Sequence, residues 1–64
     1  MKGNIKTLVK EKGFGFIMGE DGVEYFFHRS SLKNIEFDQL EKNQEVEFED
    51  AEGPKGPRAE DIFV

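Results

Sequence analysis

The sequence predicts an all-β fold, a small antiparallel β-barrel of five strands. Short segments of β-branched and aromatic residues recur along the chain, turn-forming residues separate them, and no segment has the spacing of an amphipathic helix. A chain of 64 residues is expected to form one domain, residues 1–64. Five short strands in so small a domain hide their edges by closing into a barrel.

The first half of the chain is predicted to form a three-stranded meander. Residues 5–9 are β-branched and apolar and form the first strand, and residues 14–18 form the second after a polar turn at 10–13. Residues 19–22, Gly-Glu-Asp-Gly, are a strong hairpin signal. The aromatic residues 23–28 then form the third strand.

The second half is predicted to hold two further strands. Its expected elements are helical turns at 29–32 and 38–42, a strand at 45–49, a loop at 51–57 and a final strand at 59–64. The strand at 45–49 alternates with a period of two, so Val46 and Phe48 are expected to face inward. The loop is predicted because residues 51–57 contain two glycines and two prolines.

The composition of the chain excludes several classes of function. The chain has no cysteine, so neither disulfides nor thiolate chemistry is expected. No apolar run approaches the roughly 20 residues of a membrane span, and the basic N-terminus lacks the apolar stretch of a signal peptide. We therefore expect a soluble cytoplasmic protein that does not enter membranes.

The net charge of −5 argues by itself against nucleic acid, because phosphate contacts need Lys and Arg. The charges are unevenly distributed, however. Residues 1–18 carry four lysines against one glutamate, whereas residues 34–64 carry three basic residues against ten acidic ones. One face can therefore attract phosphate while the rest repels it; the alternative is an acidic surface without electrostatic function.

Residues 12–17, Lys-Gly-Phe-Gly-Phe-Ile, are the most informative segment. In a strand, Phe14 and Phe16 point to one side, while Gly15 and Ile17 point to the other. Two exposed phenylalanines are a costly apolar patch, and stacking on unpaired bases, worth roughly 1–3 kcal/mol per base, is a reason to keep them. The alternative is that both rings belong to the core and Gly15 marks a bulge.

A second aromatic segment, Tyr25-Phe26-Phe27-His28, follows the first and is itself followed by Ser30. Other distinctive segments are Phe37, Leu40-Glu41-Lys42-Asn43-Gln44 and Gly53-Pro54-Lys55-Gly56-Pro57-Arg58-Ala59. As an ordered set spanning nearly the whole chain, these segments resemble the bacterial cold-shock proteins, a family of cold-shock domains. The resemblance implies a Greek-key barrel of the OB-fold type that binds single-stranded RNA or DNA through its first three strands.

The resemblance also implies which residues contact nucleic acid. The rings expected to stack on bases are Phe14, Phe16, Phe26, His28 and, from the long loop, Phe37. The basic residues expected near phosphates are Lys6, Lys12 and Lys55. Tyr25 and Phe27 would point inward, because they alternate with Phe26 and His28.

The chain departs from the family at three aromatic positions. Thr7 and Leu8 stand where the family usually has Trp-Phe on the binding face, and Arg29 stands where a Phe usually follows the histidine. Arg29 partly compensates, because a guanidinium stacks on bases and pairs with phosphate, whereas Thr7 does neither. We expect an RNA-chaperone-like binder with a smaller platform and lower affinity than typical members.

No catalytic or metal-binding constellation is expected. His28 is the only histidine and has no recognisable catalytic or ligand partner, and no nucleophile lies beside an activating base. The sequence therefore predicts a monomeric binding protein without enzymatic activity, metal or cofactor. The main competing hypothesis is a barrel of the same type that has lost nucleic-acid affinity and binds another protein through the same face.

Overall fold

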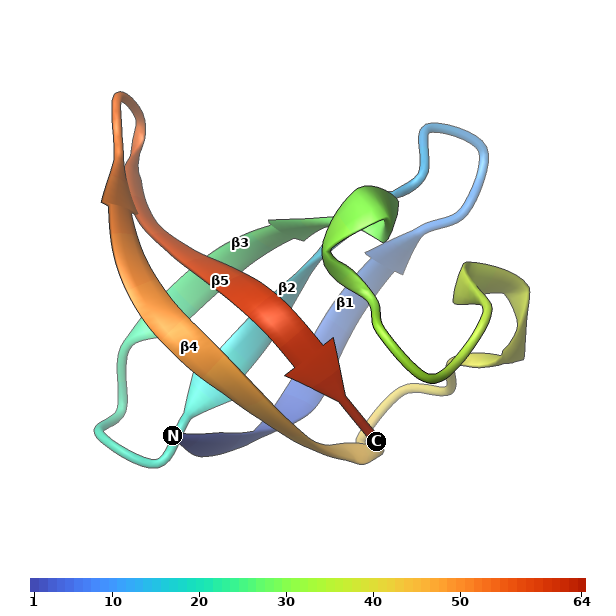
Figure 1. Ribbon diagram of the computed structural model, residues 1–64, viewed down its shortest axis with the longest axis horizontal. Helices are drawn as coiled ribbons and strands as arrows, with labels where there is room; N and C mark the ends of the chain where they lie inside the picture. Colours follow the sequence, from blue (N-terminus) through green and yellow to red (C-terminus); the bar gives the residue numbers. More distant parts are fainter.

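The protein is described by a computed structural model that covers residues 1–64 and forms a closed five-stranded β-barrel (Figure 1). The strands are β1 (Lys2–Val9), β2 (Phe14–Gly19), β3 (Glu24–His28), β4 (Glu45–Gly53) and β5 (Gly56–Phe63). Their order around the barrel is β1-β2-β3-β5-β4, and β4 also pairs with β1. The predicted all-β barrel is confirmed.

Four of the five strand pairings are antiparallel, and β3 and β5 run parallel. The connection between β3 and β4 carries two short 3₁₀ helices, η1 (Arg29–Ser31) and η2 (Phe37–Gln39). These match the two expected helical turns, although the second begins and ends earlier than predicted. The connection takes the chain across the barrel, and this crossing brings β5 alongside β3 (Figure 1).

The expected loop at 51–57 is wrong, because most of it belongs to a tight hairpin. Gly53 of β4 pairs with Gly56 of β5, so only Pro54 and Lys55 lie between the strands. Gly56 has a φ of 115°, which a residue with a side chain rarely adopts. Pro57 is tolerated within β5 because this end of the strand pairs only with β4. The hairpin extends beyond the barrel at the upper left of Figure 1.

The core is built from the inward-facing residues of all five strands and from the connection. Its ten residues are Ile5, Ile17, Tyr25, Phe27, Phe37, Leu40, Val46, Phe48, Ala59 and Ile62. The predicted inward directions of Val46, Phe48, Tyr25 and Phe27 are confirmed. Leu8 is half-buried and packs against this core.

Gly15 decides which side of β2 faces the core. A Cβ at this position would lie 2.4 Å from the carbonyl oxygen of Thr7 and 2.9 Å from the ring of Phe27. Gly15 is therefore required where β1 and the Phe27 ring come closest to β2, and it is buried. The pairing of β2 with β3 runs without a register shift; the shifts lie in β1 between Ile5 and Thr7 and in β4 between Glu47 and Glu49.

Candidate nucleic-acid interface

Three phenylalanines lie on the outer surface of β2 and β3. Phe14 and Phe16 of β2 and Phe26 of β3 are partly exposed and do not belong to the core. The ring centroids are 5.5 Å apart for Phe14 and Phe26, 5.9 Å for Phe16 and Phe26, and 6.3 Å for Phe14 and Phe16. We call this group the ring cluster. Its rings contact one another, as aromatic pairs do at 4.5–7 Å, and the alternative that they are core residues is wrong.

The strand registers extend the ring cluster into two rows of side chains. One row crosses four strands and consists of Thr7, Phe16, Phe26 and Arg58. The other consists of Val9, Phe14 and His28. Paired residues on neighbouring strands stand about 5 Å apart on the same face, so each row forms a continuous strip. Thr7 is exposed at one end of its row.

His28 is held in one orientation by the 3₁₀ helix that follows it. Its Nδ1 accepts a hydrogen bond from the backbone N–H of Ser30 at 3.1 Å and lies 3.0 Å from the Ser30 hydroxyl. Because Nδ1 is the acceptor, the proton of the neutral ring is assigned to Nε2. The partly exposed ring thus stands beside Phe14 with its Nε2–H donor unused by the protein.

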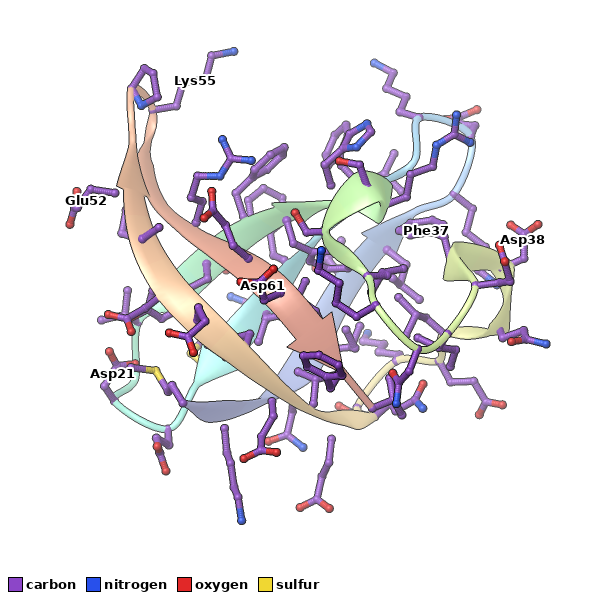
Figure 2. The ribbon with its side chains drawn as sticks, viewed as in Figure 1. Asp21, Phe37, Asp38, Glu52, Lys55 and Asp61 are labelled. Atoms are coloured by element: carbon purple, nitrogen blue, oxygen red, sulfur yellow. The ribbon has the colours of Figure 1, made fainter.

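The three lysines expected near phosphate differ in their surroundings. Lys6 forms an ion pair with Glu24 at 2.6 Å, in which both side chains are about half exposed. An exposed pair of this kind contributes about 0–1 kcal/mol and can be replaced by a phosphate contact. Lys12 is exposed in the turn between β1 and β2. Lys55 projects into solvent from the tip of the β4–β5 hairpin (Figure 2).

Arg29 lies outside both rows. Its backbone N–H donates to the carbonyl oxygen of Gly13 at 2.9 Å, and its side chain runs along the same glycine, where a Cβ would be 3.0 Å from Arg29 Cδ. The exposed guanidinium therefore stands over the turn between β1 and β2. Thr7 belongs to the neighbouring row, paired with Phe16, and no contact brings the Arg29 side chain to it.

Phe37 is a correction to the predicted site. Its side chain is 6% exposed, and its ring centroid lies 6.1 Å from that of Phe27 in the core. It begins η2 and is buried within the barrel from the long connection, so its ring is not an exposed stacking platform (Figure 2). The prediction fails because the long connection folds back on the barrel and packs the Phe37 ring against Phe27, where burial of apolar area adds to a thin core.

Arg58 is a neighbour of the ring cluster that the sequence does not reveal. It belongs to the segment Gly53 to Ala59 that supports the family resemblance, in which only Lys55 is expected to contact nucleic acid. The parallel pairing with Phe26 places it next to the ring cluster. Residues 26 and 58 are far apart in the chain, so only the barrel topology joins them. The sole local signal is its alternation with the buried Ala59, which turns Arg58 outward.

The opposite end of the β2–β3 pair is fastened by Asp21. One carboxylate oxygen accepts a hydrogen bond from the Tyr25 hydroxyl at 2.7 Å, and the other accepts from the N–H of Val23 at 3.1 Å. The bond from Tyr25, followed by that from Val23, lowers the pKa of Asp21. The same bond raises the pKa of Tyr25 to about 12. Figure 2 shows Asp21 in the turn between β2 and β3.

The partly exposed rings of this surface can stack on flat, uncharged groups of a ligand. A few basic side chains nearby can contact its negative charges. No group of three or more His, Asp or Glu side chains is arranged to hold a metal ion. No helix has the length and apolar character needed to cross a membrane.

Comparison with known proteins agrees with this surface. The family model described as "'Cold-shock' DNA-binding domain" matches residues 1–64. The cold shock-like protein CspC of Bacillus cereus is 42% identical over 62 residues, which cover 97% of this chain and 95% of that protein. CspJ of Salmonella typhi is 48% identical over 63 residues, covering 97% and 90% respectively. CspE of Buchnera aphidicola is 46% identical over 64 residues, covering 98% and 93%.

The predicted resemblance is thus confirmed along the length of the chain. Fold, outward-facing aromatic side chains and sequence identity all point to the same group of nucleic-acid-binding domains. The chain belongs to the cold-shock domain family.

Proposed function

We propose that this protein binds single-stranded RNA or DNA by stacking unpaired bases on the ring cluster, without catalysing a reaction. The observation that carries the proposal is the contact of three partly exposed phenylalanine rings on one outer surface, beside the fixed ring of His28. Every base presents a π-face, so such a surface binds strands of many sequences. Bases within a duplex are already stacked on one another and offer no face to the rings.

The proposed affinity is lower than that of relatives with more aromatic residues on this face. Thr7 contributes no ring to its row, and neither Arg29 nor Phe37 adds an exposed platform there. Weak binding that tolerates many sequences suits an RNA chaperone, which must hold strands open and then release them. We place this activity in the cytoplasm and assign it to the monomer, because one barrel carries the whole ring cluster.

Electrostatic attraction has a small part in the proposed mechanism. The cations proposed to approach phosphate are Lys6, Lys12, Arg29 and Lys55, and Lys6 must leave Glu24 to do so. At roughly 0.7 per phosphate contact on a single strand, four contacts give a slope of log affinity against log salt no steeper than about −3. A much steeper slope would make charge, rather than stacking, the main source of affinity.

The test is a fluorescence titration with labelled single-stranded and duplex oligonucleotides, in RNA and DNA versions, at two salt concentrations. Single strands are expected to bind well ahead of duplex. Phe16→Ala should weaken single-strand binding by about 1–3 kcal/mol while the barrel remains folded. Phe63→Ala is the matched control, because Phe63 is 48% exposed on β5 and lies outside the ring cluster.

Each negative result has a distinct meaning. Equal affinity for duplex and single strand would contradict the stacking mechanism. Equal losses in Phe16→Ala and Phe63→Ala would remove the ring cluster as the binding site. If neither single strands nor duplexes bind, the competing hypothesis is favoured, in which the same surface binds another protein.

A further inference from the structure

A hollow lies beside the ring cluster, between the barrel and the β4–β5 hairpin. Its volume is about 340 Å³, and the residues that line it are Phe16, Phe26, Gly53, Pro54, Lys55, Gly56, Pro57 and Arg58. Two aromatic rings form one wall, and two prolines with two glycines form much of the other. Apolar walls of this kind suit a flat base better than a phosphate, which needs donors around it.

Arg58 is the charged side chain closest to the rings within this hollow. It pairs with Phe26 in the register of β3 and β5, and so ends the row that begins at Thr7. Its stem lies against Gly53, where a Cβ would be only 3.1 Å from Arg58 Cδ. The absence of a side chain at Gly53 therefore lets the arginine lie flat along the hairpin.

The guanidinium of Arg58 is buried at its Nε end. Its Nε is buried without a hydrogen-bond partner and lies 3.4 Å from a carboxylate oxygen of Glu60. The side chain as a whole is 35% exposed. The donors left for a ligand are therefore the two Nη groups.

A guanidinium at the edge of a base-sized hollow has a specific chemical partner. Guanine presents two acceptors, O6 and N7, on one edge, and arginine donates to both at once. Adenine carries an amino donor in place of O6, and thymine and uracil lack N7, so none of them offers this pair. The rings of Phe16 and Phe26 supply apolar contact for the same base.

We propose that the hollow beside Arg58 is a base subsite that selects guanine. This inference rests on the proposed single-strand binding and adds a sequence preference to it. A strand lying across the ring cluster would place one base in the hollow, where Arg58 donates from its Nη groups to O6 and N7. The preference belongs to a single position of the strand, because the rows contain one arginine.

The test compares a seven-nucleotide thymine strand with strands that carry one guanine at each position in turn. At one position guanine should bind about tenfold more tightly than thymine, which is the size of discrimination expected of a bidentate pair. Replacing that guanine by 7-deazaguanine, which lacks the N7 acceptor, should remove most of the gain. Adenine at the same position should bind no better than thymine.

Two variants test the residue itself. Arg58→Gln removes the cation, and the ratio of guanine to thymine affinity should fall to about one. Arg58→Lys keeps a donor that can still reach O6 or N7, so the ratio should fall only in part. Lys55→Gln is the matched control, because it lines the same hollow from the hairpin tip but should weaken both strands equally. Circular dichroism and a thermal melt establish that each variant is folded, and Arg58→Lys remains informative if Arg58→Gln is not.

The outcomes separate this inference from the proposed function. If the thymine strand binds and guanine gives no advantage at any position, the guanine subsite is overturned while single-strand binding stands. If the Arg58 variants weaken both strands by the same factor, Arg58 contacts phosphate and the base assignment is wrong. If no strand binds at all, both proposals fail together.

Discussion

The outer surfaces of β2–β3 and of β4 have the same alternation of inward and outward residues but carry different kinds of side chain. β2, β3 and the first half of β4 alternate between inward and outward residues, and the inward positions include Phe27 of β3 and Phe48 of β4. The outward positions of β2 and β3 carry the ring cluster and His28, whereas those of β4 begin with Glu45, Glu47 and Glu49. Alternation therefore specifies the barrel, and the outward residues alone distinguish a candidate binding surface from an acidic one.

The comparison also explains how an acidic protein can present a surface for nucleic acid. The barrel measures 24 × 22 × 18 Å, which is about twice the screening length of roughly 10 Å at moderate salt. The outward glutamates Glu45, Glu47 and Glu49 belong to a strand that pairs with β1 and β5 but not with β2 or β3, so they repel a nucleic-acid strand on the ring cluster less than charges on β2 or β3 would. The net charge of −5 describes the molecule as a whole and is a poor guide to this one surface.

The largest expected effect separates two neighbouring residues of β3. Phe27→Ala should cost about 3–5 kcal/mol, because its ring is fully buried, and a domain of this size has about that much stability in total. Phe26→Ala should cost about 1 kcal/mol, as for most substitutions outside the core, and reduce strand affinity about tenfold. Urea unfolding and oligonucleotide titration measure both. A folded Phe27→Ala variant would contradict the division between inward and outward positions.

The next effect is a gain of binding at the open end of the first row. Thr7 is exposed and pairs with Phe16, so Thr7→Trp should add a stacking surface without burying it in the core. Affinity for a thymine- or uracil-rich strand should rise about tenfold, and stability should change by less than about 0.5 kcal/mol. An unchanged dissociation constant in a folded variant would remove β1 from the binding surface.

A pH effect is expected at the end of the barrel remote from Phe14 and His28. Tyr25 loses its proton near pH 10 in the unfolded chain but at about 12 in the folded one, so its contribution to stability should be constant below pH 10 and be lost between 10 and 12. Asp21 has a lowered pKa when folded, so its contribution should be present above about pH 4 and lost as the pH falls further. Unfolding measured against pH follows both changes.

Tyr25→Phe provides the control for this pH dependence. The variant removes the hydroxyl that donates to Asp21, so the decline between pH 10 and 12 should disappear. The loss of stability at acid pH should become smaller but should not disappear, because the bond from the Val23 N–H to Asp21 remains. If stability still falls between pH 10 and 12 in Tyr25→Phe, the fall is caused by another titratable group.

The smallest expected effects compare one glutamate on each surface. Glu24→Gln releases Lys6 from its ion pair beside the ring cluster, and should strengthen single-strand binding about two- to fivefold. Glu47→Gln removes the same charge from β4, and should change affinity by less than about twofold. The two variants have the same net charge, so equal titration curves would mean that only the total charge matters.

The sequence by itself determined the parts of this protein that depend on local periodicity. The alternation in residues 14–18 and 23–28 is enough to put Phe14 and Phe16 on the side opposite Ile17, and Phe26 on the side opposite Phe27; which side of residues 14–18 faces the core is shown only by the structure. Period-two alternation assigns a side to every residue of a strand, whatever the strand pairs with. The number of strands and the aromatic character of one surface follow from the same signal.

Tertiary structure decided whatever depends on contacts between distant segments. The pairing of Phe26 with Arg58 and the burial of Phe37 against Phe27 join residues that no local pattern relates. In the sequence Gly15 is only a residue with little to pack, and its requirement becomes visible when β1 and Phe27 lie against it. Barrel closure sets these contacts, because the register between non-adjacent strands is chosen by packing of the whole core.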